Sequence, residues 1–153
     1  MSQIDHYLTA DDLAASLRRD VRAGLTSTPK VLPPKYFYDG RGSELFEDIT
    51  RLPEYYQTRA EATILDERAD DIADLTKART LVELGSGSSE KTHLLLRALR
   101  GIGSLETYVP VDVSEDAIAW ALPGLVAEYP GLEVHGIVAD FERHLDRLPQ
   151  DGP

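Results

Sequence analysis

The stretch LVELGSGSSEKT, residues 81–92, sets the fold class of this chain. It begins as an apolar run, turns polar at Gly85 and Gly87, and ends on a Lys-Thr pair. An apolar run that passes into a glycine turn and then a helix is typical of units that hold a ligand against bare backbone at the helix N-terminus. We therefore expect a strand with Glu83 near its end, a ligand-holding turn, and a helix.

Two phosphate-binding motifs do not match this turn. A Walker A loop requires glycine immediately before its Lys-Thr pair, whereas here Glu90 precedes Lys91 and its charge would oppose a phosphate. A dinucleotide fingerprint requires a third glycine three residues after Gly87, and that position is again Glu90. We expect no P-loop, rank an NAD-dependent oxidoreductase last, and favour a compact ligand with an adenosine part.

The second half of the chain alternates strand and helix patterns. Residues 80–84, 107–113 and 133–139 are short strand-like runs, and apolar residues at helical spacing fill both gaps between them. This order predicts an α/β fold with a Rossmann-like parallel sheet of about three strands and right-handed crossovers, in which ligands lie beyond the carboxyl ends of the strands. The Pro123-Gly124 pair is expected to break or restart the second crossover helix.

The first half of the chain predicts helices and an aromatic loop. Leucine and valine recur every fourth residue over 11–25, which indicates an amphipathic helix entered through Thr9 or Asp11. A loop rich in proline, glycine and tyrosine follows, and Ser43 is expected to cap a short helix after it.

A capping box of Thr58 and Glu61 is expected to open a longer helix. We accordingly divide the chain into an N-terminal helical cap with a substrate-side aromatic loop, residues 1–77, and an incomplete Rossmann-like half, residues 78–153.

Composition limits the classes of partner. A chain of 153 residues buries one ordinary core, and 27 acidic against 16 basic residues give a formal charge of -11, which repels nucleic acid. No run approaches the ~18 apolar residues of a membrane span, and Asp5, Asp11 and Asp12 interrupt any secretory signal. We expect a cytoplasmic protein that binds neither nucleic acid nor a membrane. The lack of cysteine excludes a disulfide framework.

Two carboxylates follow the second and third strand patterns. Asp112 lies where an acidic side chain accepts both ribose hydroxyls in nucleoside-binding units. Asp140 is followed by Phe141, so a carboxylate could accept an exocyclic amino proton while a ring covers an adenine face. Taken alone, either aspartate is better explained as a helix cap at the start of the following loop, but three strand ends in register favour an adenosine site.

The chain resembles the class I S-adenosylmethionine-dependent methyltransferases in its acidic strand end, its Gly-x-Gly turn and its two strand-end aspartates. More narrowly, LPEYYQTRAE (residues 52–61) and ELGSGSSEKT (residues 83–92) resemble the histidine-specific N-alpha-methyltransferases of ergothioneine biosynthesis. The resemblance covers nearly the whole chain. It implies an enzyme that methylates the α-amino group of L-histidine to the trimethylated betaine, hercynine, with S-adenosyl-L-methionine as cofactor and no metal.

The resemblance also implies roles for individual residues. The cofactor contacts would be Gly85, Lys91, Asp112, Asp140 and Phe141.

Tyr55 would contact the substrate histidine, and we add Tyr38 as a second substrate-side candidate. For both tyrosines packing of the helical cap is the alternative. The four histidines show no metal-ligand spacing, so we expect them on the surface or in the core.

Members of this family continue beyond the point where this sequence stops, through further strands and an inserted substrate domain. We therefore expect a sheet truncated after about three strands, with the 80–84 strand open on one side, and a chain with weak or no turnover. The alternative is a non-catalytic binding or interaction module that completes its sheet with a partner or a second copy. An open edge of this kind would allow self-association.

Overall fold

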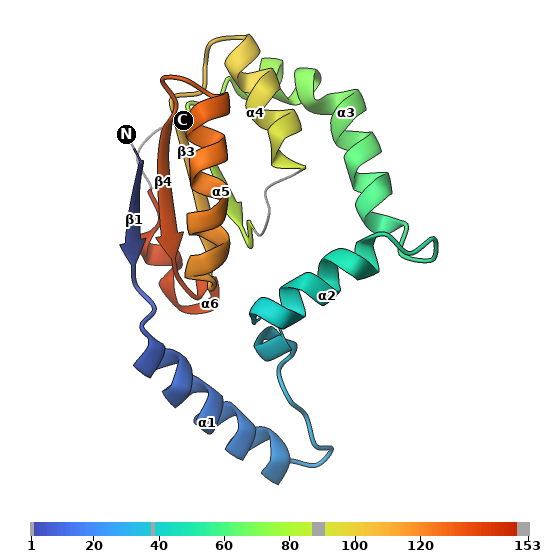
Figure 1. The fold of residues 1–153 in the computed structure, drawn as a ribbon, viewed down its shortest axis with the longest axis vertical. Helices are drawn as coiled ribbons and strands as arrows, with labels where there is room; N and C mark the ends of the chain where they lie inside the picture. Colours follow the sequence, from blue (N-terminus) through green and yellow to red (C-terminus); the bar gives the residue numbers. More distant parts are fainter. Residues whose placement is uncertain (1, 38, 87–90, 150–153) are drawn as a thin grey trace.

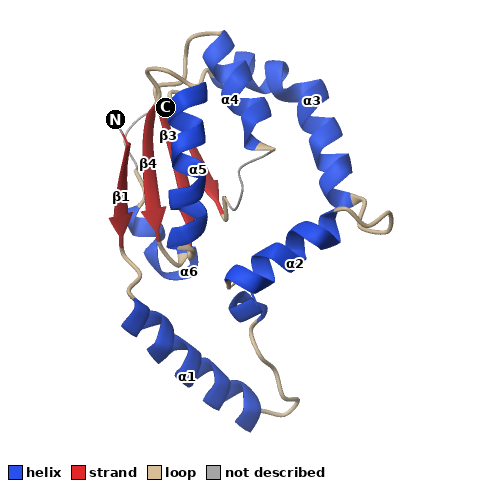
Figure 2. Ribbon diagram, in the orientation of Figure 1, coloured by secondary structure: helices blue, strands red, loops and turns tan. Residues whose placement is uncertain are grey.

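The structure is a computed structural model that describes residues 2–37, 39–86 and 91–149, apart from the side chains of residues 141 and 142. Figures 1 and 2 show its elements. The strands are β1 (Ser2–His6), β2 (Thr80–Leu84), β3 (Thr107–Asp112) and β4 (Glu133–Val138). The helices are α1 (Ala10–Thr26), α2 (Gly40–Thr50), α3 (Gln57–Thr76), α4 (Thr92–Gly101), α5 (Glu115–Glu128) and α6 (Phe141–His144), with 3₁₀ turns η1 (Pro34–Phe37) and η2 (Leu145–Arg147).

The described strands form one parallel sheet in the order β1-β4-β3-β2 (Figure 1). The three strands expected from the sequence are confirmed, and the fold is the α/β, Rossmann-like arrangement that was predicted. Register is set residue by residue, with Thr80 opposite Thr107 and Thr107 opposite Glu133. Because all strands point the same way, their carboxyl ends lie at one edge of the sheet.

Strand β1 was not expected from the sequence. It pairs with β4 from Ser2 opposite Val134 to His6 opposite Val138, and Asp5 bonds to the His135 ring at 2.9 Å. The stretch SQIDH has one large apolar residue and is mostly exposed, so no alternating pattern marks it. Pairing with β4, rather than burial, makes it a strand. The division of the chain at residue 77 stays a prediction.

Helices α4 and α5 cover one face of the sheet, and α3 packs on α4 (Figure 1). Tyr108 and Val134 of the sheet are fully buried there, against Leu96, Leu99 and Leu125 of the two helices. Each such buried side chain contributes ~1.5–3 kcal/mol, so this layer holds the crossovers in place. The other face has a smaller buried cluster of Val109, Val111, Ile137 and Ala139.

Three local expectations about the helices prove wrong. α2 begins at Gly40, with Asp39 accepting from the Gly42 amide at 2.8 Å, so Asp39 and not Ser43 is the cap. α3 begins at Gln57 without a side-chain cap, and the carboxylate of Glu61 accepts from Lys91, the residue before α4, rather than closing a box with Thr58. By contrast, the expected entry of the first helix through Thr9 is confirmed, and Thr9 also forms a capping box with Asp12.

The third expectation concerns the Pro123-Gly124 pair, which does not break α5. A proline inside a helix loses one backbone hydrogen bond and crowds the preceding turn. Here Ile118 and Leu122 before the pair and Leu125 after it are buried in the same core layer. Packing on the sheet therefore keeps one continuous helix where the local signal predicts an interruption.

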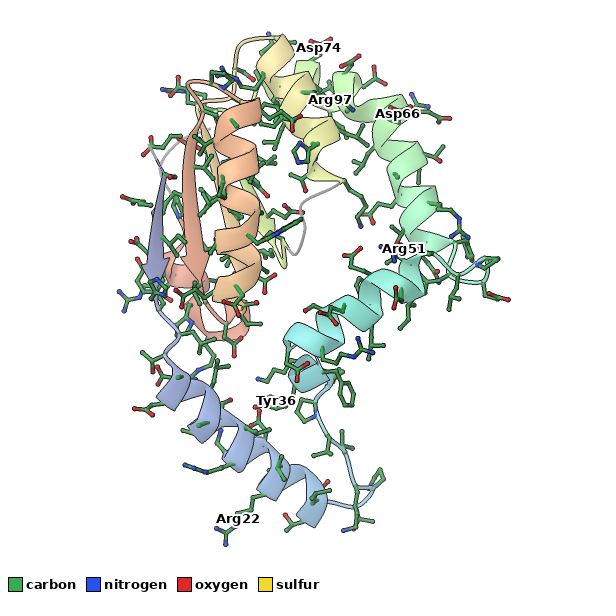
Figure 3. All side chains as sticks on the ribbon, in the orientation of Figure 1. Arg22, Tyr36, Arg51, Asp66, Asp74 and Arg97 are labelled. Atoms are coloured by element: carbon green, nitrogen blue, oxygen red, sulfur yellow. The ribbon has the colours of Figure 1, made fainter. Side chains whose placement is uncertain are left out.

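The N-terminal helices extend away from this core. α1 and α2 contain no fully buried large apolar residue, and Leu13, Leu17, Leu45 and Ile49 on them are exposed. Tyr36 lies between α1 and α2 (Figure 3), with its hydroxyl 2.6 Å from an oxygen of Asp20. This hydrogen bond, followed by the charge of Lys35, lowers the pKa of Asp20. Among the described helices, none combines the length and apolarity that a membrane crossing requires.

Substitution of Gly136 by alanine tests the packing of β4 under α5. A Cβ at this position would lie 2.6 Å from a methyl group of Ile118, which is itself 1% exposed. We expect the free energy of unfolding to fall by about 1–3 kcal/mol in urea denaturation, because an overpacked core must shift. Gly124→Ala is the control, since a Cβ there meets nothing within 4 Å and should stabilise α5 by about 0.5–1 kcal/mol. Losses of equal size would contradict this packing.

Candidate functional site

The carboxyl edge of the sheet brings together three of the residues predicted from the sequence. The amides of Gly85 and Ser86 both donate to the Val111 carbonyl, at 2.8 and 3.2 Å, which ties the turn after β2 to the end of β3. The Ala139 amide donates to the Asp112 carbonyl at 2.9 Å, which ties β4 to β3 in the same way. Gly85, Asp112 and Asp140 therefore follow three neighbouring strands at one edge.

Gly85 has the backbone that a ligand-holding turn requires. Its φ of +73° is in the left-handed region, which glycine adopts without strain. A Cβ built on it would meet no atom of the described residues within 4 Å beyond its two chain neighbours, so open space borders the backbone in the described structure. A ligand can approach this peptide closely.

The two strand-end aspartates have different surroundings. One oxygen of Asp112 accepts from the Ser114 amide at 2.9 Å, and Ser114 in turn caps α5. Asp140 is 9% exposed and lies 3.7 Å from the ammonium of Lys35. Phe141 follows Asp140 as the first residue of α6, but its side chain lies outside the described part, so the predicted role of its ring is untested.

Lys35 links this edge to the N-terminal helices and was missed by the sequence analysis. Its ammonium lies 3.5 Å from Asp20 of α1 as well as 3.7 Å from Asp140. Both pairs join segments far apart along the chain, and nothing in the local sequence of residues 33–38 marks one lysine as a partner of a strand-end aspartate. Only the fold reveals it.

Lys91 lies where the predicted helix begins. It occupies the position before the first residue of α4, and its ammonium pairs with Glu61 of α3. The lysine side chain is 38% exposed, so the pair is open to water. A cation at this point can meet the negative end of a ligand that lies along the turn after β2.

Glu83 ties β2 to its neighbours just before the turn. Its carboxylate accepts from the Tyr108 hydroxyl on β3 and from Thr92 Oγ1, the first residue of α4. Tyr108 is fully buried and Thr92 is 6% exposed. One carboxylate therefore fixes both ends of the segment that runs from β2 into α4.

Of the two predicted substrate residues, only Tyr55 belongs to the described part of the chain. Tyr38 lies outside the described residues. Tyr55 is half-buried in the connection between α2 and α3, where its ring packs edge-on against Phe46 with centroids 6.1 Å apart. Figure 1 shows this connection on the far side of α2 and α3 from the strand ends.

Arg59 fixes the conformation of that connection. Its guanidinium donates to the carbonyls of Thr50, Leu52 and Pro53 at 3.3, 3.0 and 2.7 Å. The segment is thus held by a side chain of α3, so Tyr55 has a defined place even though it lies apart from the strand ends.

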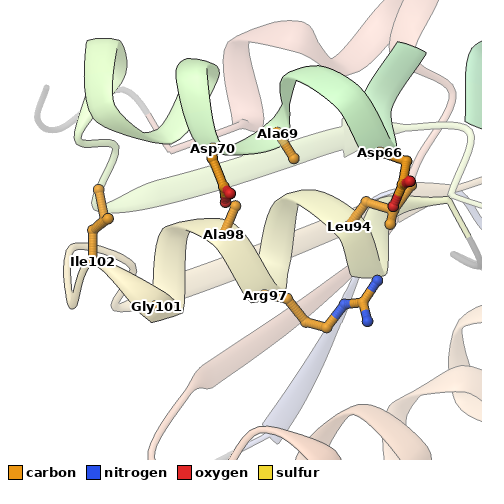
Figure 4. Close-up of a pocket in the computed structure, with 8 residues that line it drawn as sticks. All are labelled: Asp66, Ala69, Asp70, Leu94, Arg97, Ala98, Gly101 and Ile102. Atoms are coloured by element: carbon orange, nitrogen blue, oxygen red, sulfur yellow. The ribbon is translucent and has the colours of Figure 1, made fainter. Parts of the chain in front are cut away.

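A pocket of about 350 Å³ lies elsewhere, between α3 and α4 (Figure 4). Its lining consists of Asp66, Ala69, Asp70, Leu94, Arg97, Ala98, Gly101 and Ile102. None of these is a predicted site residue, and the pocket is a groove between two packed helices. Within the described part of the chain, no group of three or more histidine or acidic residues is placed to hold a metal ion.

The sequence matches a known protein family and its members. Residues 17–153 match the family model described as histidine-specific methyltransferase, SAM-dependent. The chain belongs to this family. It is 54% identical over 147 residues to the histidine N-alpha-methyltransferase of Mycolicibacterium smegmatis, an alignment that covers 96% of this chain and 46% of that protein.

More distant relatives carry other names. The ergothioneine biosynthesis protein 1 of Neurospora crassa is 36% identical over 121 residues, which cover 78% of this chain and 14% of that protein. The 4-dimethylallyltryptophan N-methyltransferase of Claviceps purpurea is 32% identical over 142 residues, which cover 88% of this chain and 41% of that protein. The chain thus spans less than half the length of these family members.

The strand-end residues fit the cofactor that the family name implies. S-Adenosylmethionine has a ribose, an adenine and a terminal carboxylate. The described edge offers two carboxylates for hydroxyl and amino donors, a lysine at a helix start, and open space beside Gly85. The two aspartates can accept from the ribose hydroxyls and the adenine amino group, and the lysine has the charge opposite to that of the cofactor carboxylate.

Replacement of Thr92 by valine tests the role of Glu83. The change removes the hydroxyl that donates to Glu83 while it nearly keeps the side-chain shape. We expect the free energy of unfolding to fall by about 1.5–3 kcal/mol, the range for a hydrogen bond to a charged group, in urea denaturation. Thr92→Ser keeps the hydroxyl and loses one methyl group, so its loss should stay near ~0.8 kcal/mol. If serine costs as much as valine, the hydroxyl is not what holds α4 to β2.

Proposed function

We propose that this chain is the cofactor-binding part of an S-adenosylmethionine-dependent methyltransferase that acts on the α-amino group of L-histidine. The observation that carries the proposal is the alignment of Gly85, Asp112 and Asp140 at the carboxyl ends of three hydrogen-bonded parallel strands. Family membership and 54% identity to a histidine N-alpha-methyltransferase support the substrate. The product of repeated transfer would be the trimethylated betaine, hercynine.

Each strand end has a proposed role toward the cofactor. Asp112, which also accepts from the Ser114 amide, would accept from the ribose hydroxyls. Asp140 and Phe141 would hold the adenine by its amino group and its ring face. Lys91 would pair with the terminal carboxylate of the cofactor. Its ion pair with Glu61, which is open to water, would weaken when it does so.

The reaction places few demands on the protein. The cofactor supplies a methyl group on a positively charged sulfur, whose carbon–sulfur bond breaks as a carbon–nitrogen bond forms. An ammonium has no lone pair, so the substrate nitrogen must first lose a proton to water or a nearby group. Alignment of the two reactants and exclusion of water then matter more than a strong acid or base.

The substrate side supports a proposal of weak or no turnover. Tyr55, the proposed histidine contact, packs on Phe46 in the connection between α2 and α3 that Arg59 fixes, and Figure 1 shows this connection apart from the strand ends. Because transfer requires both reactants within contact distance, cofactor binding and catalysis would be separable in this chain.

Isothermal titration with S-adenosylhomocysteine tests the cofactor site. We expect binding by the 153-residue chain and a loss of roughly tenfold or more in Asp112→Asn, which removes the charge but keeps an acceptor for the Ser114 amide. Asp116→Asn is the matched control, because it makes the same charge change on the exposed first turn of α5. Mass spectrometry of histidine incubated with S-adenosylmethionine should detect little trimethylated product. Efficient trimethylation would contradict the proposed lack of turnover, and absence of binding would contradict the function.

A second candidate function is a non-catalytic interaction module that pairs through β2. Within the described residues β2 bonds only to β3, and Leu84 at its end is 47% exposed. An unpaired edge beside apolar surface favours addition of a further strand. Size-exclusion chromatography with light scattering should then give a dimer, which a charged substitution such as Val82→Lys on β2 should reduce. A monomer at all concentrations would count against this candidate.

A further inference from the structure

Ser86 is a buried serine whose hydroxyl has no partner. It follows Gly85 in the turn after β2, is 6% exposed, and its Oγ makes no hydrogen bond within the described structure. Buried hydroxyl groups are normally paired, because burial removes their bonds to water. An exception of this kind at a ligand-holding turn calls for an explanation.

Two described acceptors at the end of β2 and β3 are already engaged. The Val111 carbonyl accepts from the amides of both Gly85 and Ser86, at 2.8 and 3.2 Å. The Glu83 carboxylate accepts from Thr92 and Tyr108. The amides of Gly85 and Ser86 and the Glu83 carboxylate thus have partners, whereas the Ser86 oxygen has none in the described structure.

The other buried polar side chains of the described chain behave differently. Ser16, which is 4% exposed, accepts from Tyr36 and from Arg19 at 3.1 and 3.0 Å. Thr92 donates to Glu83, and Asp140 lies beside Lys35. Ser86 is thus the exception among buried polar residues here, and it lies next to Gly85, where open space borders the backbone.

We propose that the Ser86 hydroxyl binds the cofactor directly, through an oxygen of its ribose or of its terminal carboxylate. A serine hydroxyl can donate to a carboxylate and can both donate to and accept from a ribose hydroxyl, so either group completes its bonding. This inference rests on the proposed function, since it takes S-adenosylmethionine as the ligand of the edge. It adds a side-chain contact from the turn after β2, directly after Gly85.

Ser86→Ala separates this role from a structural one, because it changes stability and affinity in opposite directions. Removal of an unpaired buried hydroxyl should leave the Tm of the ligand-free chain unchanged or raise it by about 2–4 °C. The same change should weaken S-adenosylhomocysteine binding about three- to tenfold in isothermal titration. A structural hydroxyl would instead lower the Tm when removed.

Ser104→Ala is the matched control. Ser104 lies in the turn before β3, at the opposite edge of the sheet, and its hydroxyl donates to the Leu99 carbonyl at 3.3 Å. Its loss should lower the Tm and leave the affinity for S-adenosylhomocysteine unchanged.

Titration with methylthioadenosine, which keeps the ribose and lacks the amino-acid carboxylate, distinguishes the two contacts. A weaker affinity of Ser86→Ala for both compounds supports the ribose, and a loss confined to S-adenosylhomocysteine supports the carboxylate. Unchanged affinity for S-adenosylhomocysteine, or a lowered Tm, overturns the inference while the proposed function stands. If the unsubstituted chain binds neither compound, the proposed function fails and this inference fails with it.

Discussion

Parallel pairing of β2, β3 and β4 is the constraint on which the rest of this structure depends. It places the ends of three strands at one edge, where backbone bonds to Val111 and Asp112 tie the following turns to one another. Parallel strands require crossovers, and α4 and α5 provide them by packing on the same face. The candidate site is a direct product of that topology, because no single segment contains more than a part of it.

Polar contacts then connect the edge to the remainder of the chain. Glu83 joins β2, β3 and the start of α4, and Lys35 joins Asp140 to Asp20 of α1. The partners of Glu83, Tyr108 and Thr92, are buried. The pair of Lys35 with Asp20 instead reaches α1, a helix whose large apolar side chains are largely exposed. The sheet half and α3 are therefore organised by the core, whereas α1 and α2 contain no fully buried large apolar residue.

This contrast bears on function. The residues proposed for the cofactor lie on the ends of core strands, where packing defines their backbone positions. Tyr55 lies on a connection fixed by Arg59 and Phe46, apart from the strand ends. The strand ends proposed for the cofactor and the residue proposed for the substrate thus belong to separately organised parts of the chain.

The sequence by itself determined the β2, β3 and β4 strands, their crossover helices and the strand-end aspartates, because alternating patterns and glycine turns are local signals. It missed β1, misplaced the starts of α2 and α3, and predicted a break at Pro123. Tertiary structure decided these features, since pairing with β4 and burial in the core outweigh local preference. It alone revealed the Lys35 contact and the unpaired hydroxyl of Ser86, because such interactions depend on which distant atoms the fold brings together.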